Sequence, residues 1–305
     1  GKEKVISTEG YRNKLKNEPA IAEQLIKKCE AEAVALKQKL KGQSGTTLLD
    51  VIREDLHLLV KTTGDPQSMT LILAAMDASV WLNEKMKEWL GEKNVADILT
   101  QSAPNNITSE MGLELLQVAD MIRPYAAVIT YLQETKDDNF LAVLPAIEGG
   151  VAARDAIEGY LDKYGMRCTG EIDITRTRWS EKPLTLVPLI LSNLRNLPPG
   201  EGYRRFEQGL KQSHNKEREI LARLARLPDA EQKIEETKRM IGLVRTFAGY
   251  REYPKYHLVH CYFIYKQALL QEADRLVKAN VLKNKRDIYY LNYEELYEVV
   301  RTQQL

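Results

Sequence analysis

The stretch DPQSMTLILAAMDASVWLNEKMKEWLG, residues 65–91, decides the fold class. It opens with Asp-Pro, a good N-cap residue followed by the residue that suits the first helical position, and it closes with glycine, a common helix stop. Its apolar side chains recur with a period near 3.6 residues. From Met69 to Leu82 the segment is apolar nearly all round except for Asp77. This pattern predicts a long helix at the centre of the core.

The helical period recurs along most of the chain, whereas the two-residue alternation of strands is nearly absent. Further helices are predicted over residues 19–40, 47–60, 109–122, 125–134, 183–196, 203–227, 229–247, 254–279 and 293–301. Residues 138–163 are helical in pattern, but Pro145 and the pair Gly149 and Gly150 should kink that helix. Only GEIDITRTRW and DIYYL alternate. We therefore predict an all-α, bundle-like domain of many helices with at most a short strand pair.

Length and composition bound the organisation of the protein. The 305 residues suffice for one large domain or two ordinary ones, and helical subregions 1–136 and 137–305 are predicted. A net charge of +1 argues against nucleic acid as a partner, and no apolar run is long enough for a membrane span. Three widely spaced cysteines without a CxxC pair favour a reducing cytoplasm.

Most familiar chemical motifs are absent. The chain has no glycine-rich phosphate loop, no GxSxG and no HExxH, so ATP binding by those routes is not expected. His257 and His260 are three residues apart, a spacing compatible with metal ligation. No third ligand is evident in the sequence, and no metal site is predicted.

Two charged segments are unusual. In GYREYPKYH, Arg251 and Lys255 stand four residues apart at the start of a predicted helix, where like charges repel and oppose the helix dipole. Something negative should therefore lie near them. In DKYGMRCTGEIDITRTRW, Glu171 and Asp173 alternate with isoleucines in a predicted extended segment, which would bury the isoleucines and turn both acids toward arginines. Because nearby arginines keep carboxylates ionised, a structural clasp is favoured over catalysis.

Three segments together resemble one family. YLDKYGMRCTGEIDITRTRWSEKP, GYREYPKYHLVHCYFIYKQALL and VLKNKRDIYYLNYEEL closely resemble the central domain of rifampicin phosphotransferases, which are related to phosphoenolpyruvate synthase. The strong likeness runs from Gly149 to Val300, and the N-terminal half agrees in helical character. The resemblance implies that residues 1–305 are a rifamycin-binding domain fragment, lacking the family's ATP-grasp and phosphohistidine domains.

The resemblance also implies an activity. Such an enzyme is a dikinase-type phosphotransferase that moves the β-phosphate of ATP, through a carrier histidine, to a hydroxyl of the rifamycin ansa bridge. The products are AMP, phosphate and an inactivated drug, which confers antibiotic resistance. The implied partners are a rifamycin and the two missing domains of the same polypeptide. ATP and magnesium would serve the full enzyme, whereas this fragment would bind no cofactor and be inactive alone.

The implied catalytic residues are Arg251 and Lys255, which would receive the phosphoryl group, and Glu252, which would accept the hydroxyl proton or hold Arg251 in position. A large, mostly apolar acceptor calls for a helix-lined pocket. The candidates for its lining are Met69, Leu73, Met76, Met111 and Gly112.

Two alternatives remain open at this stage. The chain could be the middle domain of another enzyme related to phosphoenolpyruvate synthase, such as a synthase or a pyrrole-condensing ligase, which acts on a different acceptor. It could also be a helical scaffold without chemistry of its own.

Overall fold

The computed structural model describes residues 8–62 and 65–305, and within them every regular element is an α-helix or a short 3-10 helix. The predicted all-α class is confirmed. The chain forms two compact units. Unit 1 takes the described residues up to Ile26, together with Pro66–Asp162 and Pro183–Pro254. Unit 2 contains the described residues of Lys27–Asp65, together with Lys163–Lys182 and Lys255–Leu305. The units thus alternate along the chain, whereas the sequence suggested a division after residue 136.

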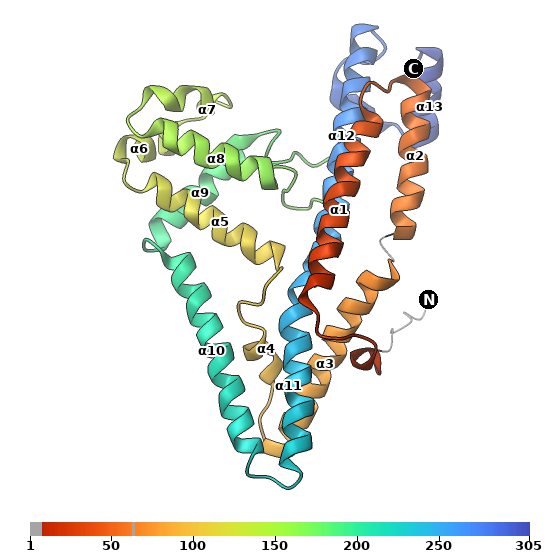
Figure 1. The fold of residues 1–305 in the computed structure, drawn as a ribbon. Helices are drawn as coiled ribbons and strands as arrows, with labels where there is room; N and C mark the ends of the chain where they lie inside the picture. The colour runs from red at the N-terminus through yellow and green to blue at the C-terminus, as the bar shows by residue number, and fades with distance from the viewer. Residues whose placement is uncertain (1–7, 63–64) are drawn as a thin grey trace. The chain divides into compact units, whose positions relative to one another are not determined.

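Unit 1 is built around a long central helix. The unit contains the first residues of α1, up to Ile26. Its other α-helices are α3 (Pro66–Leu90), α4 (Val95–Leu99), α5 (Ile107–Ile122), α6 (Ala126–Glu134), α7 (Phe140–Val143), α8 (Gly150–Tyr164), α9 (Val187–Asn196), α10 (Glu201–Leu224) and α11 (Ala230–Phe247). Its 3-10 helices are η1 (Tyr11–Asn13), η2 (Leu144–Ala146), η3 (Pro183–Leu186) and η4 (Gly249–Glu252). Helix α3 packs along α11, and α10 and α11 form an antiparallel hairpin (Figure 1).

The predicted central helix is confirmed as α3, and its single buried acid has a structural role. Asp77 accepts hydrogen bonds from the backbone N–H and the guanidinium of Arg12, each at 2.9 Å. A buried carboxylate without partners would be costly, so this pairing accounts for an aspartate in the core. It also fastens η1 to α3.

The predicted helix over residues 138–163 is wrong in detail, because the segment breaks instead of kinking. Helix α7 ends at Val143, η2 contains Pro145, and α8 begins only at Gly150. Gly149 has φ +76°, and a Cβ placed on Gly150 would lie 1.6 Å from the carbonyl oxygen of Leu144. Two glycines are therefore needed for the chain to turn back on itself here.

Unit 2 contains the rest of α1 (Pro19–Leu40), α2 (Gly45–Thr62), most of α12 (Tyr253–Lys278), the 3-10 helix η5 (Lys285–Tyr290) and α13 (Tyr293–Thr302). Its core joins α1, α2 and α12 through buried residues that include Leu36, Ile52 and Ile264. Helix α13 packs on α2.

Neither alternating run forms a strand. DIYYL lies mostly in η5, which a capping box between Asn284 and Asp287 initiates. GEIDITRTRW forms a series of turns, with Gly170 at φ +74° and the Asp173 carboxylate accepting from the backbone N–H of Thr175 at 2.9 Å. Such a local side-chain bond offers the backbone an alternative to extended pairing. Ile172 is 54% exposed and Glu171 is buried, contrary to the predicted alternation, whereas Ile174 is partly buried against the core of unit 2.

Candidate functional site

The short helix η4, which carries Arg251 and Glu252, is fixed to unit 1 at two points. A Cβ on Gly249 would lie 2.2 Å from the carbonyl oxygen of Pro104, so only glycine permits the observed approach of η4 to the loop before α5. The next residue, Tyr250, is fully buried, and its hydroxyl lies 2.9 Å from the Ser68 hydroxyl on α3. The backbone of the two charged residues is therefore held from both sides.

Arg251 and Glu252 border a cavity of about 450 Å³ within unit 1. Its walls come from α3, α4, the loop before α5, and the segment that joins α11 to η4. Small and apolar side chains such as Ile72, Ala75 and Val80 form one wall. Much of the remaining lining is polar, so the cavity combines an apolar wall with convergent hydrogen-bonding groups that could orient a small molecule.

The charged side chains at this cavity are loosely held. Arg251 Nη2 lies 3.6 Å from Glu252 Oε1, and the side chain of Arg251 is 63% exposed. Glu252 Oε2 is 3.5 Å from the Thr108 hydroxyl. Contacts this long leave both groups able to reorient toward an incoming ligand, because hydrogen bonds weaken steeply beyond their usual range.

Of the residues predicted to line a pocket, only one borders the cavity that contains Arg251 and Glu252. Met76 lines the cavity together with Arg251 and Glu252. Leu73 is buried, Met69 is half-buried, and neither borders it. On α5, Met111 accepts a hydrogen bond at its carbonyl oxygen from Tyr160, whereas a Cβ on Gly112 would contact nothing within 4 Å. The roles predicted for these residues remain predictions.

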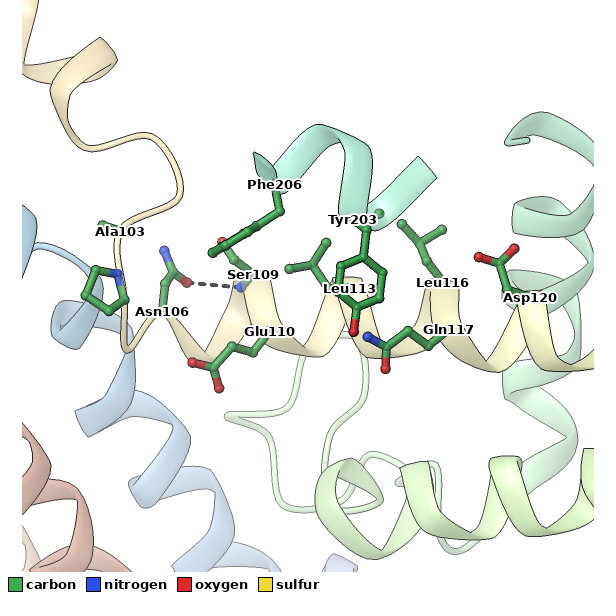
Figure 2. A pocket seen from close by; sticks show the side chains of 12 residues that line it. Ala103, Asn106, Ser109, Glu110, Leu113, Leu116, Gln117, Asp120, Tyr203 and Phe206 are labelled. Carbon is green, nitrogen blue, oxygen red and sulfur yellow. Dashed lines mark hydrogen bonds between the residues drawn. The ribbon is translucent and has the colours of Figure 1, made fainter. Parts of the chain in front are cut away.

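A second pocket, of about 240 Å³, lies between α5 and α10 (Figure 2). Leu113 and Leu116 of α5 face Tyr203 and Phe206 of α10, so the lining is mostly apolar. This pocket and the first one share Ala103 and Asn106 in their linings. The sequence predicted α5 as a pocket wall but named Met111 and Gly112, which lie beside the lining residues Glu110 and Leu113.

Sequence reasoning missed the polar lining of the first cavity. The side chains concerned are Ser79, Asn83, Asp97, Thr100 and Asn106. Only Asn106 gave a signal that could have been used, because it precedes α5 in an N-cap position, where its side chain accepts from the Ser109 N–H at 3.0 Å. The others come from α3, from α4 and from Thr100 directly after α4, and no local sequence pattern reveals that these segments converge.

Lys255 belongs to unit 2, where its partner is Glu171. Its ammonium lies 3.3 Å from Glu171 Oε1, and Arg167 Nε donates to Glu171 Oε2 at 2.6 Å. The Arg167 guanidinium also lies 5.7 Å from the centre of the Tyr256 ring, within range of a cation–π contact. The predicted negative group near these cations is thus Glu171 for Lys255 and Glu252 for Arg251. Because α12 begins at Tyr253, the two cations do not share one helix.

Asp173 is placed differently from Glu171. It is exposed, its carboxylate accepts from both the hydroxyl and the backbone N–H of Thr175, and Arg176 lies 3.6 Å away. These hydrogen bonds, with a smaller contribution from the arginines, lower the pKa of Asp173 below its ordinary value. Only Glu171 therefore forms the predicted clasp in the interior, and Asp173 organises a surface turn.

No helix among the described residues is long and apolar enough to cross a membrane.

Comparison with known proteins gives a consistent result. The model of the rifampicin phosphotransferase fourth domain matches residues 67–252, more than half of the chain. Rifampicin phosphotransferases of Bacillus subtilis and Bacillus cereus are 58% and 57% identical to it over 95% of its length, and that of Streptomyces sviceus is 54% identical over 94%. The likeness therefore extends well beyond the predicted limits of Gly149 and Val300. The chain spans about a third of the length of these relatives. The two alternatives raised from the sequence, a related enzyme with a different acceptor and a helical scaffold without chemistry, are not favoured by these matches. The chain belongs to the rifampicin phosphotransferase family.

Proposed function

We propose that this chain is the antibiotic-binding part of an enzyme that phosphorylates rifamycins. ATP, water and the drug would become AMP, inorganic phosphate and a drug phosphorylated on a hydroxyl of its ansa bridge. The β-phosphate would pass through a carrier histidine. The ATP-grasp and phosphohistidine domains, with ATP and magnesium, would belong to the same polypeptide outside this chain, and the enzyme would act in the cytoplasm.

One observation carries the proposal: Arg251 and Glu252 border the same cavity as Met76. The cavity offers apolar walls for a large, rigid ligand, and its edge offers a guanidinium for a phosphoryl group. The cavity and the apolar pocket of Figure 2 share two lining residues, so an extended ligand could occupy both. Lys255 is proposed, from the family resemblance, to contact the phosphoryl group as well.

The roles of the charged residues follow from their chemistry. The Arg251 guanidinium would stabilise the negative charge on the phosphoryl group during transfer. Glu252 would accept the proton of the attacking hydroxyl. Its contacts with Arg251 and Thr108 are long, so its carboxylate is free to turn toward that hydroxyl. The alternative role, holding Arg251 in position, needs only a hydrogen-bond acceptor. Glu252→Gln should then retain activity if Glu252 positions Arg251 and lose it if Glu252 is the base.

The test compares two half-reactions in the complete enzyme. In Arg251→Met, phosphorylation of rifampicin should fall by about 10²-fold or more, since one preorganised donor at a developing charge contributes about that factor. Phosphorylation of the carrier histidine by ATP should change far less, because it occurs on other domains. Arg218→Met, an exposed arginine on α10, is the matched control and should leave both reactions unchanged.

Two results would count against the proposal. If the rate of drug phosphorylation by Arg251→Met stays within about threefold of the parent rate, the phosphoryl group is not transferred at Arg251. Failure of the complete enzyme to bind rifampicin in a calorimetric titration would show that rifampicin is not its substrate.

A further inference from the structure

A group of metal-ligating side chains lies in unit 2, between α1 and α12. Cys29 and Glu32 are three residues apart on one face of α1, and His257 lies in the first turns of α12. The Cys29 sulfur, a Glu32 carboxylate oxygen and a His257 ring nitrogen all lie within 4.8 Å of one another. His257 Nε2 is 3.2 Å from Glu32 Oε2. The sequence analysis noted the spacing of His257 and His260 but predicted no metal site, and His260 is not a member of this group.

The separations suit a small tetrahedral ion. Zinc binds cysteine sulfur at about 2.3 Å and histidine nitrogen or carboxylate oxygen at about 2.0–2.2 Å, which places neighbouring ligand atoms roughly 3.3–3.6 Å apart. At 3.2 Å, the distance between His257 Nε2 and Glu32 Oε2 lies just below this range, and because all the ligand atoms of the group lie within 4.8 Å of one another, side-chain rotations would complete the geometry. Cysteine, histidine and carboxylate are also the three ligand types that zinc accepts.

The surroundings hold the three ligands and leave room for an ion. The buried core that joins α1, α2 and α12 fixes the two helices on which they stand. Cys261, one turn after His257, lies on the interior side with its sulfur 3.8 Å from His257 Nε2. Glu32 and His257 line a cavity of about 280 Å³, which gives space for a fourth, water ligand.

Charges of both signs lie around the group. Asp55 and Lys39 both line the same cavity and lie 3.9 Å apart, while Lys28 is paired with Asp65 at 3.2 Å, so each of these lysines has an acidic partner.

We propose that Cys29, Glu32 and His257 bind a divalent transition-metal ion, zinc by the nature of the ligands, with water as the fourth ligand. The ion joins α1 to α12 and so stabilises unit 2. This site is separate from the proposed phosphotransfer chemistry and does not depend on it.

The test uses the 305-residue chain freed of metal with a chelator. Calorimetric titration with Zn²⁺ should give one ion per chain, and saturation should raise the melting temperature, since a ligand bound only by the folded state stabilises it. Titration with Co²⁺ should produce the near-ultraviolet charge-transfer band of a cobalt–thiolate bond. Cys29→Ser should abolish that band and weaken Zn²⁺ binding at least about 100-fold, because even partners outside the ligand set contribute 10–100-fold.

Matched variants separate this site from adventitious binding. Glu32→Gln should weaken Zn²⁺ binding strongly, whereas Glu30→Gln, two residues away and exposed, should not. His214→Gln, an exposed histidine of unit 1, should also bind normally. Circular dichroism would establish that each variant is folded, which is expected for Glu32→Gln because that side chain is 44% exposed. Zinc binding that is absent, or that stays within threefold in both Cys29→Ser and Glu32→Gln, would overturn the proposal and leave only a polar contact between His257 and Glu32.

Discussion

Two arginine–glutamate pairs in this chain have the same chemistry and opposite environments. In unit 2, Arg167 and Glu171 are 2.6 Å apart, with side chains only 9% and 7% exposed. In unit 1, Arg251 and Glu252 are 3.6 Å apart, and Arg251 is largely in solvent. A buried, short pair is rigid and costly to break, whereas an exposed, long pair contributes little to stability. The difference indicates that the first pair serves the fold and the second is available for a ligand.

The largest effect on stability is expected from replacing the buried acid Glu171. Glu171→Gln leaves Arg167 without a charged partner in a buried position, so the free energy of unfolding should fall by about 3–5 kcal/mol. Urea denaturation of the chain measures the change. The double variant Arg167→Met/Glu171→Met removes both charges and should be much more stable than the sum of the single variants predicts. Additive effects would show that the two residues do not interact.

Much of the fold could be predicted because the helices carry their own signals. Residues 19–40 were predicted as a helix and form α1 with the same bounds, and α3 begins at Pro66 as its Asp-Pro sequence indicates. The strand predictions failed for a local reason. Alternation in GEIDITRTRW suggested extended backbone, but the hydrogen bonds of Asp173 to Thr175 favour turns over pairing, and no partner strand exists in the described chain.

The candidate site could be predicted only in part. The unusual charges of GYREYPKYH indicated Arg251 and Lys255, and the family resemblance added Glu252; of these three, Arg251 and Glu252 border a cavity with Met76. A helix that is apolar on nearly all faces does not indicate which face meets the core, so Leu73 and Met76 could not be distinguished. The partner of Lys255 could not be predicted either, because Glu171 is distant in sequence.

Lys255 is a second, more exposed partner of Glu171. Its side chain is 54% exposed and pairs with the Glu171 oxygen that Arg167 does not contact. Lys255→Met keeps the aliphatic stem and leaves the buried pair intact, so unfolding should become easier by only about 0.2–1 kcal/mol. A loss as large as that of Glu171→Gln would mean that Lys255, and not Arg167, is the main partner of Glu171. Denaturation of the two variants under identical conditions decides between them.

Asp173 provides the control within the same loop. An asparagine at this position keeps the Oδ1 acceptor for Thr175 and loses only the long contact with Arg176. Asp173→Asn should therefore leave stability nearly unchanged, as is usual for surface substitutions. The melting temperature of the chain measures this effect. A large decrease would show that the charge of Asp173, and not its turn geometry, holds the loop.

The smallest effect on stability is expected for Arg251→Met, and it is the most informative. Because the guanidinium is exposed and its contact with Glu252 is long, the change should leave the free energy of unfolding within about 0.5 kcal/mol of the parent. Gly249 and Tyr250 still hold η4, so the cavity should keep its shape. Denaturation of the variant chain, compared with the rate of rifampicin phosphorylation by the complete enzyme carrying the same change, separates the two kinds of role. Unchanged stability with a loss of about 10²-fold in rate would assign Arg251 to the reaction, whereas a parallel loss of both would make it a second structural pair like Arg167 and Glu171.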